Sequence, residues 1–216
     1  MPARIKSFFT KNLKYLLISS LLIISFYAFS YVVKEDFLHG FDFAATVKIQ
    51  GKIPIRVDPY FSAFSLIGSF EVTLVILIAI FLLFKRKIFS IFVIGFFCFM
   101  HVVEIIGKAF LDHPPTPIMF HRYAFDFGFP SSYVQPGGSY PSGHAMRTTF
   151  LAVIFIDIIH KSKLSKTIKL LSYSAIVDFC LIMYISRITL GEHWTTDVIG
   201  GSILGAAFAV FSLIFI

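Results

Sequence analysis

The sequence predicts an all-α protein, a bundle of six transmembrane helices formed by a single membrane-embedded domain over residues 1–216. Of the 216 residues, 57% are hydrophobic and only 14% are charged, and the mean hydropathy is +0.83. A soluble domain of ordinary composition keeps roughly a quarter of its residues charged. Lipid must therefore cover much of the surface, and 28 phenylalanines suit a lipid-facing exterior.

Long apolar stretches occur along the whole chain, and a membrane-spanning helix needs about 20 such residues. The predicted spans are Tyr15–Val33, Ser65–Phe84, Ile88–Gly107, Arg147–His160, Lys169–Ser186 and Asp197–Ile216. The fourth stretch is short, so we expect its helix to begin earlier, near Ser142. Gly201 and Gly205 in the last stretch form a small-xxx-small pair, which predicts close packing against a neighbouring helix.

The first apolar stretch follows a basic segment, as a cleaved signal peptide would. It is longer than the apolar region of a typical signal peptide, and no small-residue cleavage site follows before Lys34 and Glu35. We therefore expect a retained signal anchor.

Basic residues gather in three segments that six spans would place on one side of the membrane. None of these segments contains Asp or Glu, and their basic residues are Arg4, Lys6, Lys11, Lys14, Lys85, Arg86, Lys87, Lys161, Lys163, Lys166 and Lys169. The positive-inside rule assigns this side, with both termini, to the cytoplasm of a plasma (inner) membrane protein. The net charge of +7 is thus explained by topology and gives no indication of nucleic-acid binding. The links 34–64, 108–146 and 187–196 are then extracytoplasmic, and the first is a candidate cap over a site.

One extracytoplasmic link carries Ser186-Arg187, then His193 and then Asp197. A separation of four residues places His193 and Asp197 on one helix face if the last span begins near Glu192. The carboxylate can then accept a hydrogen bond from one imidazole nitrogen and leave the other free to attack. Arg187 offers a planar fork of donors that suits phosphate oxygens.

The other chemically rich link ends with Tyr140-Pro141-Ser142-Gly143-His144 at the start of the fourth span. Pro141-Ser142 is a helix-start signal, with Ser142 as the N-cap residue. The free N–H groups of Gly143 and His144 would then point at an anion. His144 can donate a proton to a leaving oxygen.

These two strings resemble the second and third motifs of the type 2 phosphatidic acid phosphatase superfamily, and Lys108 resembles the lysine that opens its first motif. The resemblance implies a membrane phosphatase in which His193 forms a phosphohistidine, Asp197 orients it and His144 protonates the leaving group. It further implies that Lys108, Ser142, Gly143 and Arg187 hold the phosphate oxygens. It implies no metal and no cofactor.

The sequence departs from the family in its first motif, where Arg-Pro should follow the lysine and Pro115-Thr116 stands instead. We expect Arg122 to bind phosphate in place of that arginine, with His113 as the alternative. Glu104 lies four residues before Lys108, so it either orients that lysine through an ion pair or is a packing residue.

The expected function is metal-independent hydrolysis of a lipid phosphate or diphosphate, with membrane lipids around the protein. The substrate remains open among polyprenyl diphosphate, phosphatidylglycerophosphate, phosphatidic acid and lipid A phosphate, and so does the oligomeric state. The alternatives are a lipid phosphotransferase on the same site and a non-catalytic phosphate-binding membrane protein or transporter. The two cysteines, Cys98 and Cys180, lie in apolar runs and are interpreted as buried hydrophobic residues.

Overall fold

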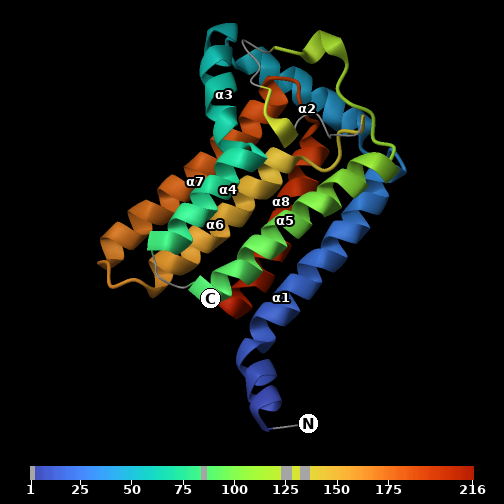
Figure 1. Ribbon diagram of the computed structural model, residues 1–216. Coiled ribbons are helices and arrows are strands. Elements are labelled where there is room, and N and C mark those ends of the chain that lie inside the picture. Colours follow the sequence, from blue (N-terminus) through green and yellow to red (C-terminus); the bar gives the residue numbers. More distant parts are fainter. Residues whose placement is uncertain (1–2, 84–86, 123–127, 132–136) are drawn as a thin grey trace.

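The computed structural model describes residues 3–83, 87–122, 128–131 and 137–216, and within these ranges it contains helices and turns but no strand. The bundle consists of long helices that run side by side (Figure 1). Their bounds are α1 Ala3–Lys34, α4 Phe70–Leu83, α5 Lys87–Phe110, α6 Gly143–Lys161, α7 Lys166–Thr189 and α8 Thr195–Ser212. An all-α architecture is therefore confirmed.

The predicted count of six spans is not confirmed, because length and hydropathy identify four candidate spans among the described residues, in α1, α5, α7 and α8. A fifth is reached if the bent pair Ile55–Gly68 and Phe70–Leu83, which meet at 54°, is taken as one span. The predicted span Ser65–Phe84 includes this bend and is therefore not one straight helix. The straight helix α4 starts only at Phe70.

The helix α6 has 19 residues but does not pass the hydropathy test. It nevertheless runs alongside α5 and α8 in the bundle (Figure 1), and most of its first three turns is buried. Protein rather than lipid surrounds this part of the helix, so it can carry Arg147, Thr148 and Thr149 without exposing them to hydrocarbon. Hydropathy underestimates such an inner helix for this reason.

The packing of α8 on α6 is the most extensive helix contact in the bundle. A Cβ atom at Gly201 would overlap the carbonyl oxygen of Ser142, and one at Gly205 would overlap that of Met146. The absence of side chains at these two positions brings the helix backbones together, as the small-xxx-small pattern predicts. The start of α6 is thereby held against the start of α8.

The 34–64 link is largely helical, with α2 at His39–Lys52, a short 3-10 turn η1 at Ile55–Val57 and α3 at Asp58–Ser65. We call residues 34–64 the cap. It lies at the end of the bundle opposite both chain termini and the α6–α7 link (Figure 1). Asp42 of the cap accepts hydrogen bonds from the Thr196 N–H at 2.9 Å and hydroxyl at 2.6 Å, so the cap is joined to the first turn of α8.

Candidate active site

The two sequence strings meet through a backbone hydrogen bond, in which the Ser142 N–H donates to the Asp197 carbonyl oxygen at 3.0 Å. Ser142 is the N-cap of α6, and its hydroxyl accepts from the Ala145 N–H at 3.5 Å. The expected helix start near Ser142 is therefore confirmed. Gly143 and His144 occupy the first turn, where backbone N–H groups lack intrahelical acceptors.

The Asp197 carboxylate is fully buried and lies between two imidazoles. His193 Nδ1 donates to its Oδ2 at 3.3 Å, and His113 Nδ1 donates to its Oδ1 at 2.9 Å. The Trp194 N–H donates to Oδ2 at 2.8 Å. The carboxylate therefore fixes the His193 ring with Nδ1 directed at Asp197, and Nε2 lies on the other side of the ring.

The local geometry of this pair differs from the prediction. The helix α8 begins at Thr195 with Trp194 as its N-cap, so His193 precedes the helix and is not part of it. Contact between His193 and Asp197 is nevertheless made, because Asp197 is at the third helical position and its side chain folds back to accept a hydrogen bond from the Trp194 N–H. The first turn of α8 thus directs the Asp197 carboxylate toward the loop that carries His193.

Arg187 lies at the end of α7 and is fully buried. Its Nη1 is paired with Glu192, and its Nε donates to Ser186 Oγ at 3.3 Å. The Nη2 atom is buried and has no partner among the described residues. Since a buried guanidinium nitrogen without an acceptor is costly, this atom indicates a place for an anionic ligand.

Glu104 of α5 is fully buried and is surrounded by basic side chains. Lys108 Nζ donates to its Oε1 at 3.0 Å, Arg147 Nη1 donates to its Oε2 at 2.7 Å, and His101 Nδ1 lies 2.8 Å from Oε2. The Glu104–Lys108 ion pair is therefore present. The sequence interpretation missed Arg147, although a charged residue inside an apolar span and one turn after His144 is a signal for function.

His144 is half-buried, and its ring lies against the turn between cap and α4. A Cβ atom at Gly68 would be 2.8 Å from His144 Cδ2. The Arg147 Nε donates to the carbonyl oxygen of the same Gly68 at 2.9 Å. The His144 ring and the Arg147 guanidinium therefore lie side by side at Gly68.

Arg122 is not brought to these residues by any described contact. Its Nε and Nη2 bind the two oxygens of Asp58 at 2.9 and 2.8 Å, and Nη1 donates to the Gln50 carbonyl oxygen at 3.1 Å. A further bond from Nη2 reaches the Ile53 carbonyl oxygen. The guanidinium expected to bind phosphate thus holds the cap, because Phe120 and Arg122 lie against α2 and the start of α3.

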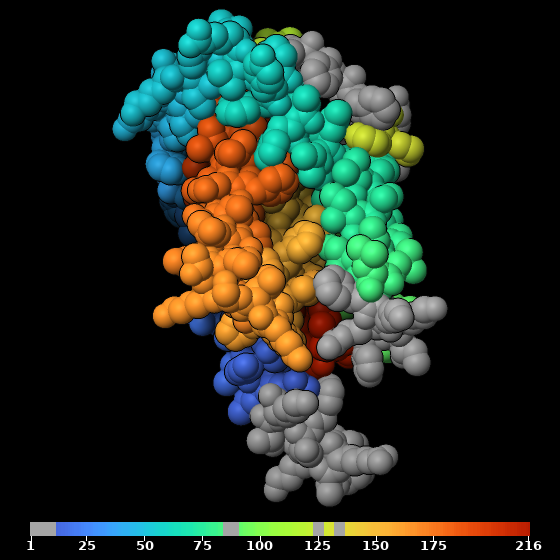
Figure 2. Space-filling model, turned by 90° about the vertical axis from the view of Figure 1, so that its left-hand side faces the viewer, coloured from blue at the N-terminus to red at the C-terminus, as the bar shows by residue number. Residues whose placement is uncertain are grey.

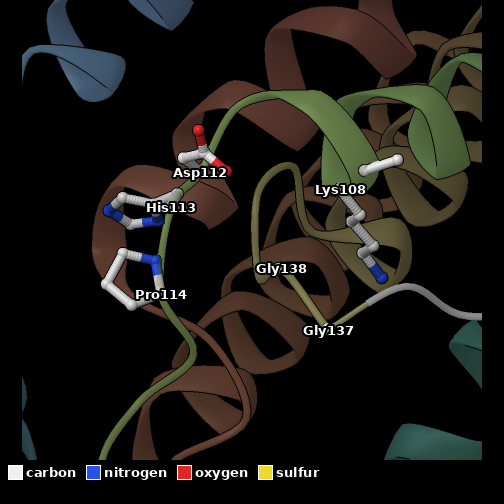
Figure 3. A pocket seen from close by; sticks show the side chains of 7 residues that line it. Lys108, Asp112, His113, Pro114, Gly137 and Gly138 are labelled. Atoms are coloured by element: carbon white, nitrogen blue, oxygen red, sulfur yellow. The ribbon is translucent and has the colours of Figure 1, made fainter.

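His113, the alternative to Arg122, is directed at Asp197 rather than at a phosphate. A pocket of about 350 Å³ separates it from Lys108 and is lined by Lys108, Ala109, Asp112, His113, Pro114, Gly137 and Gly138. Figure 3 shows the Lys108 ammonium on one side of the Gly137–Gly138 loop and the His113 ring on the other. His113 therefore supports the carboxylate of the histidine–aspartate pair.

Comparison with known proteins gives one family match, the PAP2 superfamily, over residues 90–216. A solved structure of a transmembrane PAP2-type phosphatidylglycerolphosphate phosphatase from Bacillus subtilis is similar with a TM-score of 0.70 and 18% identity, covering 91% of this chain and 93% of that chain. The structure of Aquifex aeolicus LpxE is similar with a TM-score of 0.58 and 21% identity, covering 79% of this chain and 93% of that chain. At these identities the two structures show a shared fold. No curated protein sequence matches the chain.

Proposed function

Because the chain belongs to the PAP2 superfamily, we propose that it is a membrane phosphatase that hydrolyses a lipid phosphate or diphosphate through a phosphohistidine, without a metal. The observation that carries the proposal is the His193–Asp197 pair at 3.3 Å, next to the buried, unpartnered Nη2 of Arg187. An oriented imidazole and an anion-binding guanidinium are the two parts that phosphoryl transfer to histidine requires. One of the two similar solved structures is, by its name, a transmembrane phosphatidylglycerolphosphate phosphatase.

In the first chemical step, His193 Nε2 attacks the phosphorus atom and the bond to the ester oxygen breaks. His144 donates a proton to that oxygen, so the lipid leaves as an alcohol, or as a monophosphate from a diphosphate. The Nδ1 proton stays hydrogen-bonded to Asp197, which stabilises the positive charge on the ring. In the second step His144 takes a proton from water and the water oxygen attacks phosphorus. The bond between phosphorus and His193 Nε2 breaks, its electron pair returns to the imidazole, and inorganic phosphate is released.

Positive charge and N–H groups hold the phosphoryl oxygens during both steps. Arg187 Nη2, Lys108 and the N-terminal N–H groups of α6 at Gly143 and His144 are the proposed donors, and the hydroxyl of Ser142 supports the helix start.

The proposed active site faces away from the cytoplasm. The N-terminal segment and the α6–α7 link, which carry much of the basic charge, lie at the end of the bundle opposite the cap (Figure 1). By the positive-inside rule we assign that end to the cytoplasm, so the proposed site lies on the other side of the membrane.

The proposal is tested by measuring phosphate release from a panel of lipid phosphates and diphosphates in detergent. We expect turnover by the wild type and by His160→Ala, a matched control at the far end of α6, and none by His193→Ala. Trapped labelled phosphoenzyme should likewise vanish in His193→Ala. Transfer of label to a lipid acceptor would identify a phosphotransferase, while binding of phosphate without turnover of any substrate would refute the enzyme assignment.

A further inference from the structure

An apolar hollow lies in the membrane-embedded part of the bundle between α4, α6 and α7. In Figure 2, α6 is seen at the bottom of a depression between α7, in orange, and α4, in green. The hollow has a volume of about 360 Å³ and is lined almost entirely by hydrophobic side chains of these helices and of the turn before α4. It is open to the surrounding lipid on one side.

Residues on one face of α6 and on one face of α7 connect this hollow with the proposed catalytic residues. On α6, Thr148 lines the hollow one turn below His144, and Ala152 and Phe155 follow deeper in the membrane. From Thr148 to Phe155 the helix advances about 10 Å. The hollow therefore starts directly below the catalytic histidine and runs along the helix toward the middle of the bilayer.

On α7 the same relationship holds. Phe179 lines the hollow, and Met183 and Arg187 follow at intervals of four residues on the same face. Met183 contacts the space beside Gly68, where the His144 ring also lies. Ile67, the neighbour of Gly68, is itself part of the hollow's lining. Ile67 and Met183 thus lie between the hollow and the residues around His144.

We propose that this hollow is the chain-binding groove of the enzyme and takes one acyl or prenyl chain of the lipid whose phosphate lies between His193 and His144. The inference rests on the proposed function and assigns the lipid chain a place. A second apolar hollow, lined by Ile23, Phe99 and Phe208 among others, lies between α1, α5 and α8 and has no such connection. We assign the lipid chain to the hollow between α4, α6 and α7 because this hollow is the one that lies next to His144.

The groove orients the substrate rather than increasing its affinity. A chain that moves from the bilayer into the groove exchanges one apolar environment for another, so little hydrophobic free energy is gained. Confinement of the chain instead fixes the headgroup relative to His193, and misplacement of a reacting group by about 1 Å can cost on the order of 100-fold in rate. Blocking the groove should therefore affect long-chain substrates and spare those without a chain.

Ala175 lines the groove and Ser174, its neighbour on α7, is exposed and does not line it, which gives a matched pair. Ala175→Trp should lower kcat/KM for a long-chain lipid phosphate by about 10-fold or more, while hydrolysis of a water-soluble aryl phosphate stays within about twofold. Ser174→Trp should resemble the wild type with both substrates. Equal effects of Ala175→Trp on both substrates, or an effect on neither, would overturn the groove assignment.

A binding measurement separates this inference from the proposed function. Dodecyl phosphate should raise the melting temperature of the wild type and of Ser174→Trp in bilayer discs more than inorganic phosphate does. The difference should be lost in Ala175→Trp. Absence of turnover in the wild type would refute the phosphatase proposal, whereas an unchanged difference in Ala175→Trp would refute the groove.

A second inference concerns Arg147, which is 4% exposed and borders the helix start that receives the phosphate. A Cβ atom at Gly143 would be 2.7 Å from Arg147 Nη1. Its Nε donates to the Gly68 carbonyl oxygen and its Nη1 donates to Glu104 Oε2. The guanidinium of Arg147 thus has a fixed orientation beside the N-terminus of α6.

We infer that Arg147 is the second guanidinium of the phosphate site and that Glu104 is its positioning residue. This, too, rests on the proposed function. The geometry supports it because Arg147 contacts Gly68, as His144 does, and flanks Gly143 at the N-terminus of α6. It also supplies the cation that is missing after Lys108 in the sequence, from another helix.

Three variants test whether Arg147 binds phosphate or only balances the negative charge of Glu104. The ligand in each measurement is inorganic phosphate. Glu104→Gln keeps the arginine and should still be stabilised by phosphate. The double variant Glu104→Gln/Arg147→Met removes both charges of the buried Glu104–Arg147 pair and keeps Lys108. Its phosphate Kd should be about 10- to 100-fold weaker than that of Glu104→Gln, as for loss of a charge-assisted hydrogen bond. Arg147→Lys should restore part of the affinity.

The exposed Arg56 provides the control, since Arg56→Met removes a guanidinium from the cap and should leave phosphate binding unchanged. If the double variant binds phosphate as tightly as Glu104→Gln, Arg147 only balances the charge of Glu104 and the inference fails. Because the measurement needs no turnover, its result is independent of whether lipid phosphates are hydrolysed.

Discussion

The carboxylate of Asp58 accepts two hydrogen bonds from Arg122, one from Nε at 2.9 Å and one from Nη2 at 2.8 Å. These residues are 64 positions apart, and their contact fastens the start of α3 to the long link after α5. The same guanidinium binds two carbonyl oxygens at the end of α2. Arg122 therefore joins both cap helices to the body of the protein.

From this contact we expect Arg122→Ala to destabilise the protein by about 2 kcal/mol, because it leaves the Asp58 carboxylate and two carbonyl groups without their donors. Thermal unfolding in detergent measures the effect, and Arg56→Ala in the exposed part of the cap is the control. Asp58→Asn should cost a similar amount, with the double variant little worse than either single one. Full stability of Arg122→Ala together with a 100-fold loss of kcat/KM would restore Arg122 as a phosphate-binding residue.

The sequence predicts the contacts that a single helix or helix start determines. Glu104 and Lys108 are four residues apart and pair as expected, and Ser142 caps α6 at the expected position. His193 and Asp197 also meet, although through a helix start rather than along one helix face. Spacing and capping are local properties, so they can be inferred without the fold.

Contacts between distant segments could not be inferred from residue spacing and capping. His113 reaches Asp197 across 84 positions, and Arg147 reaches Glu104 across 43. Both depend on how α5, α6 and α8 pack, which the hydrophobic pattern alone does not determine. The helix α6 was predicted, but its hydropathy is weaker than that of the candidate spans, because a helix surrounded by other helices need not be apolar.

His113 gives a prediction about pH. Burial by itself would lower its pKa, but the hydrogen bond and charge of Asp197, with the charge of Asp42, raise the pKa above its usual value. A raised folded-state pKa means that the stabilisation is complete below the unfolded value of about 6.5 and is lost as pH rises through the folded-state pKa. The melting temperature of the wild type should therefore exceed that of His113→Gln most at acidic pH.

Glutamine keeps a hydrogen-bond donor for Asp197 but cannot titrate. The pH dependence of the difference in melting temperature between wild type and His113→Gln therefore reports the titration of the His113 imidazole. We expect the difference between the two melting curves to shrink steadily from pH 6 toward pH 9. A difference that grows with pH would show that His113 is neutral in the folded protein and that its pKa is lowered.

The orientation of the protein predicts which introduced thiols are accessible in intact cells. In a background with Cys98 and Cys180 replaced by alanine, a membrane-impermeant thiol reagent should label Lys52→Cys in the cap. Lys163→Cys in the α6–α7 link should be labelled only after the membrane is opened. Both positions are exposed in the structure, so protection reports the membrane side, and the reverse pattern would contradict the positive-inside assignment.

Gly68 provides a test of the role of His144 that leaves the histidine in place. A Cβ atom at this position would lie 2.8 Å from His144 Cδ2 and 3.1 Å from Met183 Cε, so the imidazole has to shift. If His144 donates a proton to the leaving oxygen, a shift should slow alkyl phosphate hydrolysis by about 10-fold or more. A nitrophenyl phosphate, whose leaving group needs little protonation, should be affected much less.

The measurement compares kcat/KM for both substrates in Gly68→Ala, with His144→Ala as the limiting case. The control is Gly51→Ala in the cap, where an added Cβ meets no atom within 4 Å and a helix gains from the loss of glycine. We expect Gly68→Ala to show the same leaving-group dependence as His144→Ala with a smaller loss, since general acid catalysis contributes about 10²- to 10⁴-fold. If both variants slow the two substrates equally, His144 binds the phosphoryl group and the leaving oxygen takes its proton from another donor.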